Sequence, residues 1–196
     1  MGRRKRTEAL LVLEDGSEFA GRAFGKARGA SGEVVFTTGM TGYPQTLTDP
    51  SFRGQIIVST YPLAGNYGVP LTAKKLAPYT DRYGIPVHFE SERIQASGFV
   101  VSENCEEPSH FASGATLSEW LEAGGVPGVC GVDTRALTKR LREQGVMRGK
   151  IVVDGAEDAG FDSGVAGNVV AEVSCDSVKV YTPDGAPERQ LRIALV

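Results

Sequence analysis

The stretch that decides the fold is residues 116–153, TLSEWLEAGGVPGVCGVDTRALTKRLREQGVMRGKIVV. It opens with a threonine that is followed three residues later by a glutamate, the capping-box pattern that marks a helix start. The apolar residues Leu117, Trp120 and Leu121 fall at helical spacing and form one buried stripe. The pattern therefore predicts a helix over residues 116–122, which the glycine pair after it brings to an end.

The second half of this stretch predicts a strand, a helix and another strand. Residues 126–132 are nearly all apolar, which is typical of a strand buried on both faces. Asp133 is a good N-cap for a helix over 134–144, which Gly145 ends. Residues 150–153 form the last strand. A strand–helix–strand–helix–strand order that follows a run of strands indicates a layered α/β domain with both parallel and antiparallel pairing.

The first half of the chain reads as strands separated by turns. The Asp15-Gly16 dipeptide lies between two strand-like runs, which is a strong signal for a β-hairpin. β-Branched and aromatic residues are concentrated in the other runs, as in strands. The predicted strands cover residues 9–13, 18–24, 33–38, 55–60 and 94–101.

Composition excludes several classes of protein. The chain has 196 residues, of which 41% are hydrophobic and 23% charged, so a globular domain with its own core is expected. A net charge of −3 provides no positive field for nucleic acid phosphates. The three cysteines are an odd number at wide spacings, which fits neither a disulfide framework nor a zinc site and favours a reducing, cytoplasmic compartment. No apolar run is long enough to span a membrane.

Composition also changes along the chain. Residues 1–8 are basic and are predicted to be a disordered terminus. The first domain is expected to end near residue 155, because residues 154–168 are small and acidic and read as a loop or linker. Residues 169–173 are compatible with a short helix. Residues 191–196 are apolar and read as a new buried strand.

The chain offers no convincing catalytic centre of its own. Cys130 is the most attractive nucleophile, but Val132 stands where a nucleophile elbow needs a small residue, so a buried structural thiol is the better interpretation. The two histidines, His88 and His110, lack a paired motif and are interpreted as structural or surface residues. Residues 145–150 have one spacer too few for a phosphate-binding loop, and no serine or threonine follows the lysine.

Several segments nevertheless resemble one family closely, the small subunit of carbamoyl-phosphate synthetase. The similar segments occur in the family's order and cover most of residues 9–153. They are ALLVLEDG (9–16), GEVVFTTGMTGY (32–43), LTDPS (47–51), YPLAGNYG (61–68), DRYGIPVHFES (81–91) and GVDTRALTKRLREQG (131–145).

This resemblance implies a function and a domain organisation. The complete enzyme is a ligase that makes carbamoyl phosphate from glutamine, bicarbonate and two ATP, for pyrimidine and arginine synthesis. Residues 9–155 would be the N-terminal domain, a three-layer swivelling β/β/α fold that contacts the large subunit. Residues 156–190 would be a linker, and residues 191–196 would begin a class I glutamine amidotransferase domain with a Cys-His-Glu triad. ATP and magnesium would bind the large subunit, and no cofactor is expected on this chain.

One binding residue follows from the resemblance. The serine of the family's Thr-Asp-Pro-Ser motif lines the glutamine pocket, and here that serine is Ser51. Pro50 fixes the backbone of a turn and Asp49 can bond locally, so the hydroxyl can be presented outward. The alternative is that Ser51 only closes the turn. The bend at residues 41–43 is either a surface between domains or subunits, or an ordinary connector packed by its tyrosine.

Two other functions stay open at this level. The chain could be a stand-alone binding module that kept the fold without the catalytic domain. A nucleic-acid-binding protein would rest only on the basic run Arg3 to Arg6, and the net negative charge counts against it.

Overall fold

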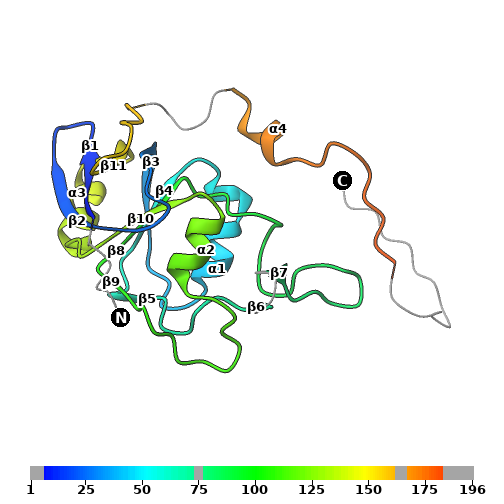
Figure 1. Ribbon diagram of the computed structural model, residues 1–196. Helices are drawn as coiled ribbons and strands as arrows, with labels where there is room; N and C mark the ends of the chain where they lie inside the picture. Colours follow the sequence, from blue (N-terminus) through cyan, green and yellow to red (C-terminus); the bar gives the residue numbers. More distant parts are fainter. Residues whose placement is uncertain (1–6, 73–76, 162–166, 183–196) are drawn as a thin grey trace.

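Seven strands close into a barrel in the computed structural model, which describes residues 7–72, 77–161 and 167–182. Their order around the barrel is β1-β11-β3-β4-β8-β10-β2 (Figure 1). The bounds of these strands are β1 Glu8–Leu13, β2 Glu18–Gly25, β3 Ala30–Thr37, β4 Ile56–Ser59, β8 Gly98–Val101, β10 Pro127–Cys130 and β11 Met147–Val153.

Helices and short strands surround this barrel. The helical elements are α1 Tyr43–Thr48, the 3-10 turn η1 Pro50–Phe52, α2 Leu117–Ala123, α3 Thr134–Gln144 and α4 Val169–Val173. Two small sheets pair β5 Leu63–Ala64 with β9 Glu103–Asn104, and β6 Leu71–Thr72 with β7 Ala77–Pro78.

The pairing is mixed, as the order of elements predicts. The pairs β3–β4, β4–β8 and β8–β10 are parallel. The remaining pairs, β1–β2, β1–β11, β2–β10 and β3–β11, are antiparallel. β1 and β2 form the predicted hairpin, and Gly16 lies in the turn with φ of +83°. The α/β class with both kinds of pairing is therefore confirmed. Closure of the sheet is a finding that the sequence pattern did not indicate.

The barrel interior is filled by every second residue of its strands. In β4, Ile56 and Val58 belong to the inner cluster and Ile57 to the outer one, as strand alternation requires. Leu137 and Leu141 of α3 join the inner cluster, so this helix packs its apolar face against it. The other inner residues are Ala9, Leu11, Leu13, Val34, Val100, Val129, Val132, Met147, Ile151 and Val153.

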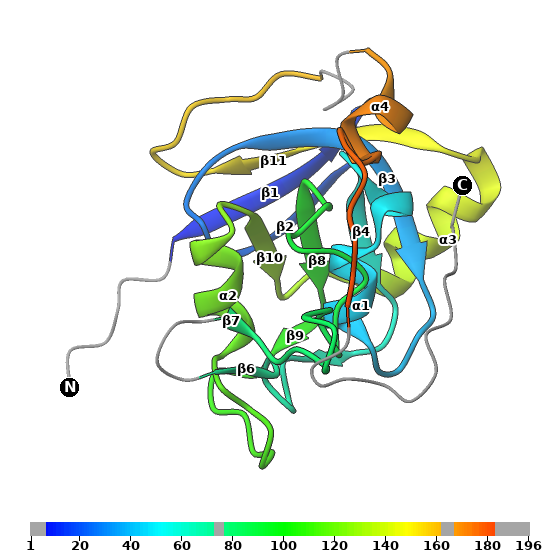
Figure 2. The ribbon, with the colours of Figure 1, turned by 90° about the vertical axis from the view of Figure 1, so that its right-hand side faces the viewer.

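A second apolar cluster lies outside the barrel, beneath α1 and α2. Leu117, Trp120 and Leu121 form the predicted buried stripe of α2, and Phe99 and Ile57 meet the helices from the sheet. Figure 2 shows α1 and α2 on the same side of the strands, with α3 away from them. The protein thus has two cores separated by one wall of the barrel.

The predicted helix starts are confirmed. Thr116 and Glu119 form the full capping box of α2. The side chain of Asp133 accepts a hydrogen bond from the backbone N–H of Ala136 at 2.9 Å, which caps α3. The predicted short helix is also present as α4, residues Val169–Val173.

Several predicted regions differ in the structure. The strands predicted over 33–38 and 150–153 each begin three residues earlier, at Ala30 and Met147. Strand 94–101 is shorter, because the N–H groups of Gln95 and Ala96 donate to the carbonyl of Leu47 and the sheet ladder begins only at Gly98. Strand 126–132 likewise reduces to Pro127–Cys130. Residues 43–48 form a helix, which is not among the predicted elements. The predicted strand 191–196 lies outside the described residues.

Candidate functional site

The Ser51 turn, defined as residues 49–54, is a hydrogen-bonded loop between α1 and β4 that contains the 3-10 turn η1. The Asp49 carboxylate accepts a hydrogen bond from the backbone N–H of Ser51 at 2.8 Å, which is the local bond that the sequence predicts. The N–H of Arg53 donates to the carbonyl of Pro50 at 3.1 Å. Ser51 is exposed, and its hydroxyl has no hydrogen-bond partner among the described residues. The turn therefore presents a free hydroxyl on a fixed backbone.

A neighbouring segment, residues 90–97, is hydrogen-bonded to both ends of this turn. The hydroxyl of Ser91 donates to the carbonyl of Thr48, just before the turn. At the end of the turn, the N–H of Gly54 donates to the carbonyl of Gln95 at 3.1 Å. Gln95 is 4% exposed, and its side-chain oxygen has no hydrogen-bond partner in the described part of the chain.

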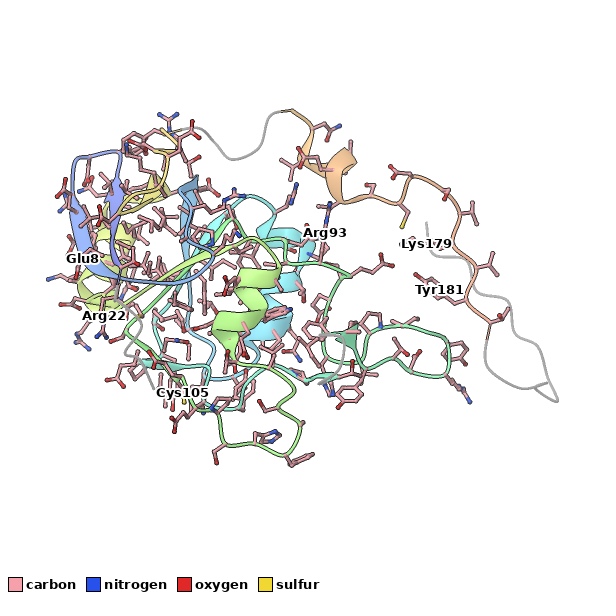
Figure 3. The ribbon with its side chains drawn as sticks, in the orientation of Figure 1. Glu8, Arg22, Arg93, Cys105, Lys179 and Tyr181 are labelled. Atoms are coloured by element: carbon pink, nitrogen blue, oxygen red, sulfur yellow. The ribbon has the colours of Figure 1, made fainter. Side chains whose placement is uncertain are left out.

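A connector, defined as residues 167–182, crosses the molecule next to the Ser51 turn. The guanidinium of Arg53 meets the carboxylate of Glu172 at 3.0 Å. Arg93 donates to the backbone carbonyl of the same glutamate at 3.0 Å, and Lys179 pairs with Glu92 at 3.1 Å. Figure 3 labels Arg93 and Lys179, which lie on the side of the molecule where the connector runs. These contacts join segments that are far apart in the sequence.

The predicted bend at residues 41–43 lies at the other end of α1. The hydroxyl of Tyr67 accepts hydrogen bonds from the backbone N–H of Gly42 at 2.7 Å and of Tyr43 at 3.2 Å. The two tyrosine rings stack at 4.4 Å, and the hydroxyl of Tyr43 donates to the carbonyl of Gly68. Burial raises the pKa of both tyrosine hydroxyls, most strongly that of Tyr43.

The bend borders a small depression between α1 and the strands. Polar and apolar side chains line it in similar numbers, and it has no charged group. Its lining residues are Thr37, Gly39, Met40, Thr41, Tyr43, Thr46, Ser59, Tyr61, Leu63, Ala64 and Phe99. Met40 at its rim is 66% exposed, so the depression opens to the surface.

The other candidate groups do not form a reactive centre in the described residues. Cys130 ends β10, and burial raises the pKa of its thiol, which lowers the fraction of reactive thiolate. His88 and His110 lie in separate loops, and residues 147–150 of the rejected phosphate loop are part of β11. The part of the chain that the structure describes contains no cluster of three potential metal ligands. No described helix is long and apolar enough to cross a membrane.

Sequence reasoning proposed Ser51, whose role stays a prediction, and gave no indication of the residues that surround it. Arg53, Arg93 and Glu172 are ordinary surface charges in the sequence, and only the fold brings them together. A signal for α1 was available, because Pro44 stands at the first turn, where its fixed φ favours a helix start.

Comparison with known proteins identifies the family. Residues 11–151 match the model of the carbamoyl-phosphate synthase small chain, CPSase domain. The chain is 53% identical over 145 residues to the carbamoyl phosphate synthase small chain of Pyrococcus furiosus, covering 74% of this chain and 37% of the relative. It is 44% identical over 193 residues to the arginine-specific small chain of Chaetomium globosum, covering 96% and 40%.

A multifunctional protein shares the same region. The chain is 46% identical over 179 residues to the multifunctional protein CAD of Squalus acanthias, covering 90% of this chain and 8% of the relative. The chain thus spans two fifths or less of the length of these relatives. The match nevertheless extends over most of the closed barrel and its helices, from β1 to β11. The chain belongs to the carbamoyl-phosphate synthase small chain family, through its CPSase domain.

Proposed function

We propose that this chain is the N-terminal structural and subunit-docking part of the small subunit of glutamine-dependent carbamoyl-phosphate synthetase. The observation that carries the proposal is the family match over residues 11–151, together with relatives named as small chains of this synthase. The complete enzyme would be a ligase that supplies ammonia from glutamine and combines it with bicarbonate and two ATP.

The domain organisation is part of the same proposal. Residues 9–155 form the N-terminal domain, 156–190 the linker, and 191–196 the start of a class I amidotransferase domain that carries the triad. The predicted disordered terminus, residues 1–8, extends too far, because Glu8 already belongs to β1; residues 1–6 lie outside the described residues. The two walls of the closed sheet with α1 and α2 on one side support a three-layer β/β/α arrangement of the swivelling kind.

Ser51 is the residue that we propose to contact glutamine. Its exposed hydroxyl, free among the described residues, and the fixed turn beneath it support this role. One hydrogen bond contributes about 0.5–1.5 kcal/mol. Ser51 would therefore add a modest amount to the affinity for glutamine, and the amidotransferase domain would form most of the pocket.

The partner would be the large synthetase subunit, which would also hold ATP and magnesium, and no cofactor is assigned to this chain. The pathways served would be pyrimidine and arginine synthesis, and the name of the Chaetomium relative supports the second. We place the complete protein in the cytoplasm, and the three free cysteines support a reducing compartment.

Size-exclusion chromatography with the large subunit from the same source, with and without glutamine, tests the docking role. We expect co-elution of this chain with that subunit. Separate elution of the folded chain, together with separate elution of the protein extended through the amidotransferase region, would contradict the proposal and favour a stand-alone binding module.

The role of Ser51 requires a kinetic test on the extended protein. We expect Ser51→Ala to raise the KM for glutamine about 2- to 10-fold, as the loss of one hydrogen bond implies. Ser109→Ala removes another exposed serine hydroxyl and serves as the matched control. An unchanged KM in Ser51→Ala would leave Ser51 as a turn residue only.

A further inference from the structure

Polar contacts attach the connector at Glu172 and Lys179, one to the Ser51 turn and the others to residues 90–97. Glu172 lies between two arginines, with its carboxylate on Arg53 and its backbone carbonyl on Arg93. Seven residues later, Lys179 pairs with Glu92, which immediately precedes Arg93. The same short segment, residues 90–97, therefore supports the Ser51 turn and holds the connector.

The burial of the connector marks Glu172 as its point of attachment. Within residues 167–182, Glu172 and Val173 are half-buried and all the others are exposed. The side chains of Arg53 and Glu172 are 29% and 32% exposed, so water screens this ion pair less than it screens a fully solvated one.

The connector also carries apolar side chains that are exposed in the structure described. Val170 is 69% exposed, Val178 is 92% exposed and Val180 is 80% exposed. A segment that combines paired charges with exposed apolar side chains is suited to lie between two bodies. In the proposed organisation, the second body is the amidotransferase region that follows the connector.

Arg53 links the connector directly to the serine. It follows Ser51 by two residues, and its N–H closes the 3-10 turn on Pro50. Its side chain holds Glu172. A displacement of the connector would therefore act on the backbone that presents the Ser51 hydroxyl.

We propose that Arg53, Arg93 and Glu92 on one side, and Glu172 and Lys179 on the other, form a latch that fixes where the connector lies relative to Ser51. These are positioning residues, since none of them needs to touch glutamine. The effect on glutamine rests on the proposed function, whereas the latch itself does not.

Hydrogen exchange on this chain tests the latch. Arg53→Gln and Glu172→Gln should each increase exchange in peptides from residues 167–182 about 2- to 5-fold, as expected for a partly exposed ion pair. The reversed pair Arg53→Glu with Glu172→Arg should restore protection. Glu14→Gln breaks the ion pair with Arg148 elsewhere and should leave the connector unchanged. Unchanged exchange in both single variants would overturn the latch.

Kinetics of the protein extended through the amidotransferase region test the positioning role. Arg53→Gln should raise the KM for glutamine roughly 3- to 10-fold with little change in kcat, and the reversed pair should recover the KM. If Arg53→Gln increases hydrogen exchange in residues 167–182 but leaves the KM for glutamine unchanged, the positioning role is wrong and the latch itself still stands. A wild-type protein without glutaminase activity would overturn the proposed function and the positioning role with it, while hydrogen exchange would still decide the latch.

Discussion

The barrel interior and the connector are held by opposite kinds of interaction. Leu11 and Ile151 in the interior are fully buried among apolar side chains. The connector exposes Val178 and is attached through ion pairs such as Arg53–Glu172. Full burial of a leucine contributes about 1.5–3 kcal/mol, whereas an exposed ion pair contributes about 0–1 kcal/mol. The interior therefore provides most of the free energy of folding. The ion pairs of the connector set where the connector lies and contribute little to stability.

The sharpest test of this difference is Leu11→Ala. Removal of a fully buried leucine from the inner cluster should lower the free energy of unfolding by about 2–5 kcal/mol, measured by urea denaturation. Leu10→Ala on the outer side of the same strand, where the residue is half-buried, should cost clearly less. Equal costs for the two variants would mean that the barrel interior is not the main core.

A smaller loss is expected from Tyr67→Phe, at the bend beside α1. This change leaves the N–H groups of Gly42 and Tyr43 without their acceptor, which should lower the free energy of unfolding by about 1–3 kcal/mol. Tyr83→Phe is the matched control, because that hydroxyl accepts from Arg82 in an exposed loop. A similar small effect in both variants would argue that the bend is not held by Tyr67.

Alkaline pH should lower the free energy of unfolding through the two buried tyrosines of the bend, Tyr43 and Tyr67. Burial raises the pKa of Tyr43 and Tyr67 above the value of about 10 for an unfolded chain. The unfolded chain therefore releases these protons first as the pH rises, so the free energy of unfolding should be unaffected below about pH 10 and fall above it.

Tyrosinate absorbance during an alkaline titration measures this directly. Tyr43 and Tyr67 should ionise only with unfolding, because burial raises the pKa of both hydroxyls. Ionisation of all tyrosines near pH 10 in the folded protein would contradict the buried arrangement.

The smallest effect on stability is expected for Arg53→Gln. Because its ion pair with Glu172 is partly exposed, the free energy of unfolding should change by less than about 1 kcal/mol, although connector protection falls. Urea denaturation and hydrogen exchange on the same sample compare the two quantities. A loss as large as that of Leu11→Ala would show that the connector belongs to the core.

Prediction from the sequence succeeded where the signal is local. The capping box at Thr116, the N-cap at Asp133 and the Asp15-Gly16 turn depend on neighbours within a few residues, and the structure confirms each. It failed at residues 94–97, because the backbone there bonds to Leu47, about fifty residues earlier in the chain. The role of Ser51 in glutamine binding stays a prediction.

The sequence by itself determined the class of the fold, its main strands and helices, and the family resemblance. These follow from periodicity, capping and motif order, which are properties of short segments. Only the tertiary structure decided that the sheet closes, which residues face its interior, and that Arg53, Arg93 and Glu172 meet beside Ser51. The physical reason is that strand closure and surface ion pairs depend on distances between remote segments, and a surface charge carries no local mark of its partner.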